Sequence, residues 1–213
     1  EKGNSFSSLL LGLMHEAGDG VEEDEEAACE YYKKAAEQGD TVAMFKYGLM
    51  LYEGVGTEEN KEEAAAYFKK AAEQGDSGAM FNYGLMLSQG EGVEQNKEEA
   101  VKYYKQSAEK GRIEAMFNYA LMVYQGDGVD ENKEEALKYF KKAADKNVLR
   151  AIIRYCEMVE KGDGCDQNME EVAHYLKEAA DQGHVQSQFK YALLLFQGIG
   201  VEENKEEAAN YFQ

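Results

Sequence analysis

Hydrophobic and polar positions along this chain form two kinds of segment, which alternate and return every 36 residues. In Thr41–Glu53, apolar side chains occupy most positions, which is typical of a helix buried on more than one face. In Asn60–Gln74, the apolar residues fall on one face, and glutamate and lysine lie mainly opposite. This second pattern predicts an amphipathic helix with one solvated side. The chain is therefore predicted to be a row of helix pairs.

The repeat is also visible at individual residue positions, where the same amino acid returns in each period. Tyrosine recurs at every period, and glycine follows four of the predicted amphipathic helices: Tyr31, Tyr67, Tyr103, Tyr139, Tyr175 and Tyr211; Gly39, Gly75, Gly111 and Gly183. Self-similarity at this period indicates stacked repeats that bury their apolar faces on one another. The sequence predicts a single array with repeats at 3–38, 39–74, 75–110, 111–146, 147–182 and a shorter 183–213. Because the last repeat is incomplete, we expect the array to be part of a longer protein.

The ends of the helices carry recognisable signals. An asparagine precedes each amphipathic helix except the first, with glutamate three residues later, which is the spacing of a capping box: Asn60/Glu63, Asn96/Glu99, Asn132/Glu135, Asn168/Glu171 and Asn204/Glu207. Paired glycines such as Gly54 and Gly56 lie between the two helices of a repeat and allow a tight reversal. The small Gly48 within the first helix is expected to let the second helix approach closely. Cys156 takes this position in the fifth repeat, where the larger side chain should open the pair.

Charge and cysteine usage narrow the classes of partner. The 42 acidic and 23 basic residues give a net charge of −19, which repels nucleic-acid phosphates and anionic lipid headgroups. No apolar run approaches the roughly 20 residues that a membrane-spanning helix needs. The three cysteines, Cys29, Cys156 and Cys165, occupy unequal positions of their repeats, so no disulfide framework recurs. Cysteine usage favours a reducing compartment, and a cytoplasmic location is expected.

The spacing of small and aromatic residues within a repeat resembles that of a known family. In the second repeat it comprises Ala43, Tyr47, Gly48, Leu51, Gly54, Gly56, Ala64, Tyr67, Ala71 and Ala72. This pattern resembles the Sel-one-like repeat (SLR) family, a branch of α/α solenoids similar to tetratricopeptide repeats but with a longer unit. The resemblance covers essentially the whole chain, although the proline that commonly follows the glycine pair is absent.

The resemblance implies an all-α fold, a right-handed α/α superhelical solenoid of six 36-residue helix-turn-helix repeats whose first helices line the concave side. It also implies an adaptor that holds other proteins together. It does not imply catalysis, and no cofactor is expected. One bacterial branch linked to β-lactam binding has recurring disulfides, which are missing here. No small-molecule substrate is therefore expected.

One polar residue precedes the central tyrosine in consecutive first helices, and we name this series the polar ladder: Lys46, Asn82, Asn118, Arg154 and Lys190. In the similar tetratricopeptide repeats, this position often holds an amide or cation that grips a peptide backbone or a terminal carboxylate. Such donors suit an extended chain with unpaired amides, and cations strengthen bonds to carboxylates. A solvated polar stripe on an otherwise apolar helix would give the same pattern. The sequence leaves both interpretations open.

Aromatic residues run beside the polar ladder at helical spacing: Phe45, Phe81, Phe117, Phe189, Tyr52 and Tyr124. They either pack adjacent repeats or flank an apolar groove for a partner, and the spacing favours packing for most of them. The fifth repeat interrupts this strip with Glu157 and Glu160 and replaces the closing glycine with Asn147. That repeat is either specialised or degenerate.

The sequence contains no arrangement of residues typical of a catalytic or metal-binding site. Cys156, Cys165 and His174 are nine residues apart, unlike the closely spaced pairs of structural zinc sites. The Gly126–Asp130 segment lacks the alternating ligands of a calcium loop and is interpreted as a turn. No serine or cysteine has a base partner by spacing, and no phosphate-binding loop is present. Neither an enzyme nor a metal site is predicted.

The predicted function is a protein–protein interaction scaffold that binds an extended peptide on its concave face. The acidic helix faces most simply form a solvated outer surface, which ranks second as a binding surface for a basic partner. The alternative function is a structural spacer or self-associating array, as a monomer or with weak end-to-end association. In that case a catalytic domain elsewhere in the parent chain, such as a signalling enzyme, would carry the activity.

Overall fold

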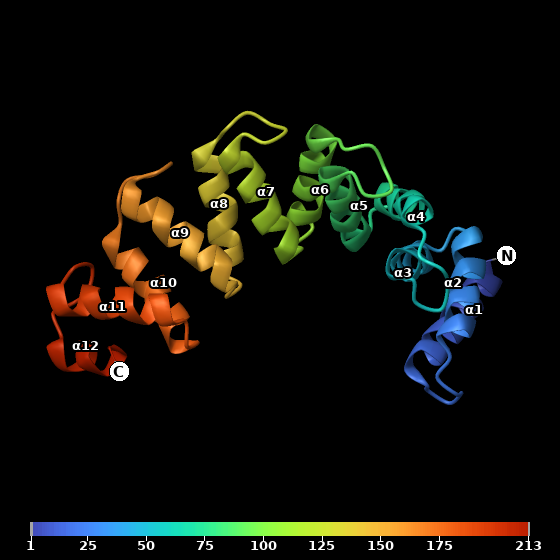
Figure 1. Ribbon diagram of the computed structural model, residues 1–213, viewed down its shortest axis with the longest axis horizontal. Coiled ribbons are helices and arrows are strands. Elements are labelled where there is room, and N and C mark those ends of the chain that lie inside the picture. The colour runs from blue at the N-terminus through green and yellow to red at the C-terminus, as the bar shows by residue number, and fades with distance from the viewer. Residues whose placement is uncertain (1, 213) are drawn as a thin grey trace. The chain divides into compact units, whose positions relative to one another are not determined.

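The computed structural model describes residues 2–212, with side chains described from residue 4 onward. Within that range every regular element is an α-helix, and the predicted all-α solenoid of helix pairs is confirmed (Figure 1). The helices are α1 (Lys2–Ala17), α2 (Glu25–Glu37), α3 (Thr41–Glu53), α4 (Lys61–Glu73), α5 (Ser77–Gln89), α6 (Lys97–Glu109), α7 (Ile113–Gln125), α8 (Lys133–Ala144), α9 (Leu149–Lys161), α10 (Met169–Asp181), α11 (Val185–Gln197) and α12 (Lys205–Tyr211).

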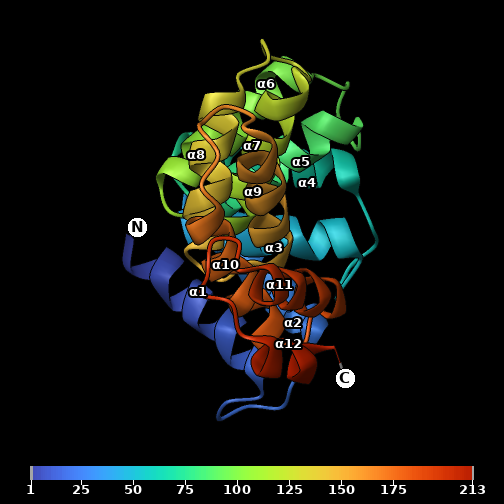
Figure 2. The same cartoon turned by 90° about the vertical axis from the view of Figure 1, so that its left-hand side faces the viewer.

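The helices form two compact units, Glu1–Arg112 and Ile113–Gln213, each containing three helix pairs. Within the first unit, α2 packs against α3, and α4 packs against α5. The second unit repeats this order, with α8 against α9 and α10 against α11. Figure 2 looks onto the second unit, where α11 and α12 lie side by side. Each unit is thus built by stacking one helix pair on the next.

The core of each of the first five pairs combines alanines with one large side chain from the second helix. In α4, Phe68 is fully buried among alanines. A Cβ atom added to Gly48 in α3 would lie 2.8 Å from the Phe68 ring, so the predicted close approach at this glycine is confirmed. Cys156 is buried at the equivalent position of α9, and α9 and α10 pack less closely than α3 and α4. The looser packing of this pair agrees with the expectation for a larger side chain.

The periodic tyrosines form edge-to-face pairs between the two helices of a repeat. The ring centroids are 4.7–5.1 Å apart in five repeats: Tyr47/Tyr67, Tyr83/Tyr103, Tyr119/Tyr139, Tyr155/Tyr175 and Tyr191/Tyr211. In the first repeat, His15 stacks on Tyr31 instead, at 5.6 Å. Edge-to-face pairs of this kind stabilise beyond simple burial of the rings. The tyrosine that marks the period in the sequence thus joins the helices of each pair.

The helix ends agree with the sequence signals. The Asn60 side chain accepts a hydrogen bond from the Glu63 backbone N–H at 3.1 Å, and the other four predicted asparagine caps do the same. The four predicted closing glycines have φ values of 85° to 97°. Asn147 adopts a φ of 62° in the remaining interior position, which asparagine tolerates better than most residues.

The second glycine of each turn also has a role between repeats. A Cβ atom added to Gly92 would lie only 2.3 Å from the carbonyl oxygen of Lys61, in the first turn of α4. The equivalent distances to the preceding second helix are 2.1 Å at Gly56, 2.7 Å at Gly164 and 2.0 Å at Gly200. No side chain fits at these separations. The glycine pair therefore allows the reversal and also lets consecutive repeats touch through their backbones.

Candidate functional site

All five residues of the polar ladder lie on first helices, from α3 to α11, and two of them pair with a glutamate of the preceding repeat. The Lys46 ammonium group lies 2.8 and 2.9 Å from the two carboxylate oxygens of Glu16 on α1. The Lys190 ammonium group lies 3.2 and 3.5 Å from those of Glu160 on α9. In each case the preceding repeat supplies a neutralising charge. These two cations therefore meet a ligand only in competition with a glutamate.

Glu16 is held by two groups. Its carboxylate also accepts a hydrogen bond from the Tyr32 hydroxyl on α2. Partial burial raises the pKa of Glu16, but the hydrogen bonds from Lys46 and Tyr32 outweigh it, and the net pKa is below the ordinary value. Glu16 is consequently anionic at neutral pH and fixes the lysine beside it.

The sequence contains a signal for these pairs that single-position patterns miss. Glu16 and Glu160 occupy the same position of their repeats, and Tyr52 and Tyr124 hold that position in the second and fourth repeats. A lysine stands 30 residues after each glutamate. Asparagine or arginine stands at the same distance after each tyrosine. Comparison of paired positions between consecutive repeats would have exposed this covariation.

The tyrosine-containing repeats leave a notch instead of an ion pair between consecutive repeats. The first notch lies between α3 and α5 and has a volume of about 90 Å³. Its lining consists of Leu49, Tyr52, Glu53, Phe68, Asn82, Leu85 and Met86. The walls are mostly apolar, and Asn82 of the polar ladder supplies an amide. We call this space the Asn82 notch.

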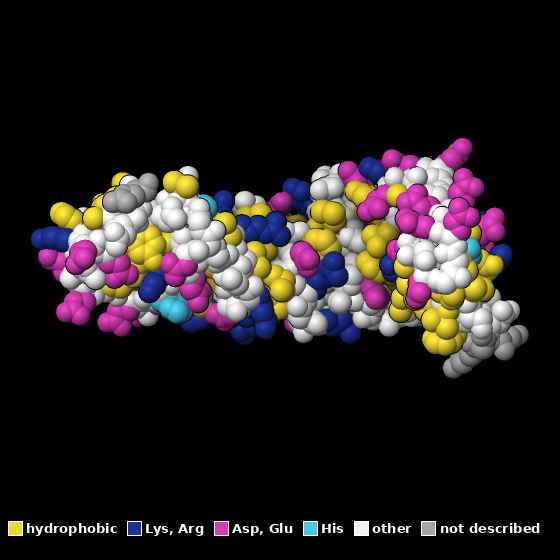
Figure 3. Space-filling view, turned by 90° about the horizontal axis from the view of Figure 1, so that it is seen from below, with side chains coloured by type: hydrophobic (Ala, Val, Ile, Leu, Met, Phe, Trp, Pro, Cys, Tyr) yellow, Lys and Arg dark blue, Asp and Glu magenta, His cyan; other side chains and the backbone are white. Residues whose placement is uncertain are grey.

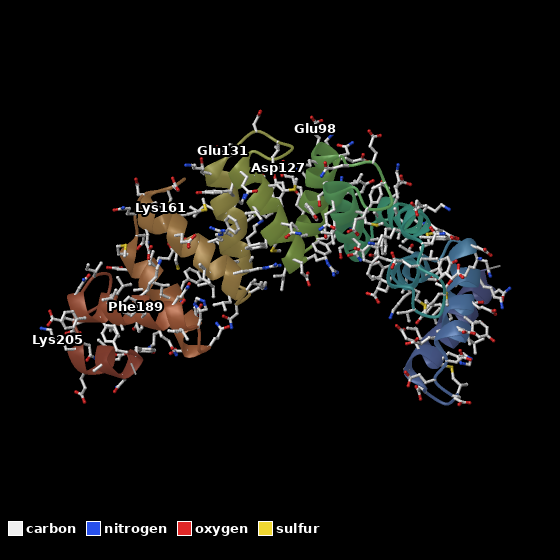
Figure 4. All side chains as sticks on the ribbon, in the orientation of Figure 1. Glu98, Asp127, Glu131, Lys161, Phe189 and Lys205 are labelled. Atoms are coloured by element: carbon white, nitrogen blue, oxygen red, sulfur yellow. The ribbon has the colours of Figure 1, made fainter. Side chains whose placement is uncertain are left out.

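A second notch occupies the corresponding place between α7 and α9, with a volume of about 70 Å³. Its lining consists of Leu121, Tyr124, Gln125, Phe140, Arg154, Glu157, Met158, Lys161 and Asp163. Arg154 of the polar ladder donates a hydrogen bond to Glu157 at 3.1 Å, and both side chains are partly exposed. Lys161, labelled in Figure 4, adds a second positive charge at the end of α9. We call this space the Arg154 notch.

A cluster of hydrogen bonds holds the tyrosine wall of each notch. The Tyr52 hydroxyl donates to Glu91 at 2.7 Å, and Lys61 binds the same carboxylate at 3.2 Å. The hydrogen bond to Glu91 raises the pKa of Tyr52, while Tyr52 and Lys61 lower the pKa of Glu91. The second unit uses Asp163 in place of Glu91, with Tyr124 at 3.4 Å and Lys133 at 3.0 Å. Both walls are therefore fixed by residues of the following repeat.

Of the remaining predicted site residues, some pack against other parts of the chain and others lie at the surface. Asn118 lies half-buried on α7. The rings of Phe45, Phe81 and Phe117 are half-buried; Phe45 packs against Gly78, and the Arg112 and Arg150 guanidinium groups lie 5.2 and 4.2 Å from the Phe81 and Phe117 ring centres. Each of these three rings therefore packs against a residue farther along the chain. Phe189 on α11 is mostly exposed.

Burial favours the protonated form of the cysteine thiols. Burial raises the pKa of the Cys156 thiol to about 12, and it also raises the pKa of Cys29 and Cys165. All three are free thiols, and the protonated form is a poor nucleophile. Across residues 2–212, no group of three histidine, cysteine or acidic side chains is arranged to hold a metal ion. No described helix combines the length and the apolar character needed to cross a membrane.

The comparison with known families decides the classification. The Sel1 repeat model matches six consecutive segments, residues 5–40, 41–76, 77–111, 113–148, 149–184 and 185–213. The chain belongs to the Sel1 repeat family. Each matched segment begins two residues after the corresponding predicted repeat, with the same period of 36. Sel1 repeat proteins are generally non-enzymatic scaffolds that bind other proteins.

Solved structures agree with the Sel1 repeat classification. The chain is similar to c5321, a protective antigen of uropathogenic Escherichia coli with an SLR fold, at 27% identity and a TM-score of 0.93 over 99% of this chain. This Sel1 repeat chain spans 45% of the length of that protein. A Sel1 repeat protein from Oxalobacter formigenes is 30% identical, with a TM-score of 0.78, over 98% of this chain and 84% of the other. No curated protein matches the chain significantly.

Proposed function

We propose that this Sel1 repeat array binds an extended segment of another protein along its first helices, the side that the family resemblance assigns to the concave face. The observation that carries the proposal is the contrast along the polar ladder. Glutamates of the preceding repeat bind Lys46 and Lys190, whereas Asn82 and Arg154 each line a notch, with Arg154 bonded only to Glu157 of its own helix. Each notch is proposed as a peptide-anchoring point of its own unit.

The Asn82 notch suits an apolar side chain beside a peptide bond. The Asn82 amide can donate to a carbonyl and accept from an N–H group, which is how an extended backbone is held in register. The Leu49 and Leu85 side chains provide apolar walls around it. A notch of this size accepts one side chain rather than a folded domain, and apolar walls with one polar group are common in ligand sites.

The Arg154 notch suits a carboxylate. A guanidinium group binds carboxylates through charge-assisted hydrogen bonds, and an incoming acid would exchange with Glu157 for Arg154. Lys161 in the same lining favours the bound anion further. The ligand of this notch is thus an aspartate or glutamate side chain or the C-terminal carboxylate of a partner.

The proposal is tested by panning the 213-residue chain against a library of short peptides with free C-termini. Selected peptides are then measured against Asn82→Ala and Arg154→Ala variants, with Lys102→Ala on the exposed side of α6 as the matched surface control. Each notch variant should weaken its peptides by about tenfold, or about 1.4 kcal/mol, and the control should have no effect. Thermal unfolding should hardly change for Arg154→Ala, since that side chain is exposed. An empty selection, or peptides indifferent to both notch variants, would refute the site.

A further inference from the structure

Glu53 is the one charged residue in the lining of the Asn82 notch. It is the last residue of α3, and its side chain is exposed. In the described part of the chain, its carboxylate takes part in no hydrogen bond and no ion pair. The side-chain amide of Asn82 likewise has no hydrogen bond to any residue that the structure describes. Two polar groups of this notch are therefore available to a ligand.

The surroundings of Glu53 are negatively charged. Two carboxylates share the Lys61 ammonium group, Glu91 at 3.2 Å and Glu59 at 4.0 Å. Glu59 lies against the turn that follows α3, because a Cβ atom added to Gly54 would lie 3.3 Å from the Glu59 backbone nitrogen. Acidic side chains also gather over the α1–α4 end of the first unit, at the right of Figure 3. This part of the notch therefore attracts a cation.

The Arg154 notch has the opposite polarity. Gln125 takes the place of Glu53 there, so the acid is missing. The charged residues of this lining other than Lys161 are bound within the chain: Arg154 with Glu157 at 3.1 Å, and Asp163 with Lys133 at 3.0 Å. Lys161 has no such partner among the described residues. Each notch thus carries one unpaired charge, which is negative in the first unit and positive in the second.

We propose that Glu53 makes the Asn82 notch selective for an extended peptide segment that carries an apolar residue and, two positions away, a lysine or arginine. The inference rests on the proposed function of this notch as a peptide site, and it adds the charge of the partner. The apolar side chain enters beside Leu49 and Leu85, and the cation pairs with the Glu53 carboxylate. An aspartate or glutamate at the same peptide position is repelled.

The separation of two positions follows from the geometry of the helix and the peptide. Leu49 and Glu53 are four residues apart on α3, which places them on one face and about 6 Å apart along the axis. Adjacent side chains of an extended peptide point to opposite faces, whereas side chains two positions apart share a face and are about 7 Å apart. A peptide with its apolar residue beside Leu49 therefore brings the residue two positions away to Glu53.

The test compares three pools of short synthetic peptides for binding to the 213-residue chain by fluorescence polarisation. Each peptide has a central leucine and, two positions before or after it, lysine, alanine or glutamate, with the other positions varied. The lysine pool should bind about two- to fivefold more tightly than the alanine pool, as expected for an exposed ion pair, and about tenfold more tightly than the glutamate pool. The preference should shrink in high salt, which screens exposed charges. Asn82→Ala should weaken binding of every pool.

Three further variants assign the preference to one residue. Glu53→Gln should abolish the preference for lysine over glutamate, and Glu53→Lys should reverse it. The matched control is Glu109→Gln, because Glu109 is also an exposed glutamate that ends a helix of the first unit. This control should leave the preference unchanged. Circular dichroism should confirm that the variants are folded, since both altered side chains are exposed.

The outcomes separate this inference from the proposed function. Binding that depends on Asn82 but is equally tight for the lysine and glutamate pools would refute the role of Glu53 alone. A lysine preference that survives Glu53→Gln, or that Glu109→Gln reduces as much, would do the same. Failure of every pool to bind, or binding indifferent to Asn82→Ala, would refute the peptide site of this notch and the inference with it.

Discussion

The Asn82 notch and the Arg154 notch occupy the same place in the repeat architecture but present different chemistry. Both have a tyrosine, a buried phenylalanine and a methionine at matching positions, 72 residues apart. The amide of Asn82 becomes the guanidinium of Arg154, and Leu85 becomes Glu157. The comparison teaches that stacked helices decide where a notch forms, whereas a few side chains decide what it accepts. Three groups of variants can break or sharpen it.

The largest expected effect tests the shared backbone. Gly92→Ala and Gly164→Ala should each lower the free energy of unfolding by about 1–3 kcal/mol more than Gly20→Ala, because the added methyl group meets the backbone of the preceding repeat. Gly20 has a similar left-handed φ without that contact, so its variant measures the conformational cost alone, about 1–2 kcal/mol. Urea denaturation at low protein concentration gives the three values. Equal losses at the three positions would show that the repeats do not depend on this close approach.

An intermediate effect is expected from exchanging the side chains of the two notches. Asn82→Arg with Leu85→Glu gives the first unit the charges of the second, and Arg154→Asn with Glu157→Leu does the reverse. Preference for acidic over apolar peptides should shift by about tenfold in opposite directions, or about 1.4 kcal/mol. Titration calorimetry with one peptide of each kind measures the shift. Unchanged preferences in both exchanged proteins would mean that these side chains do not select the ligand.

The smallest effect concerns the ladder positions that are already closed. Lys46→Met should destabilise the protein by at most about 1 kcal/mol at neutral pH, because the pair with Glu16 is partly exposed and screened by solvent. Lys190→Met should cost less, since Glu160 lies farther from its lysine. Chemical denaturation of both variants beside the unmodified protein provides the comparison.

The Lys46 effect should depend on pH in a defined direction. The pKa of Glu16 in the folded protein lies below its ordinary value of 4.5. The stabilisation from its anionic form is therefore complete well above pH 4.5 and is lost as the pH falls through the lower pKa of the folded state. The gap between the unmodified protein and Lys46→Met should shrink over that acidic range. A gap that is constant down to the acid limb would show that Lys46 acts through packing of its stem.

Much of the fold could be predicted because its determinants are local and repeated. The Asn60 cap requires only Glu63, one turn away, and the amphipathic pattern of α4 identifies its buried face without knowledge of its neighbours. Repetition then confirms each local signal several times. Only part of the candidate site could be predicted from the sequence in this way. The polar ladder could be listed, but its five members could not be separated into paired and open positions.

The sequence by itself therefore determined the helix pairs, their caps, the 36-residue period and the family. Tertiary structure alone decided that Glu16 closes Lys46 while Tyr52 leaves the Asn82 notch open, and that Gly92 touches the backbone of α4. The physical reason is the distance along the chain. Caps and helix faces depend on residues within one or two turns, whereas these contacts join residues about 30 positions apart, whose meeting is set by the register in which one repeat stacks on the next.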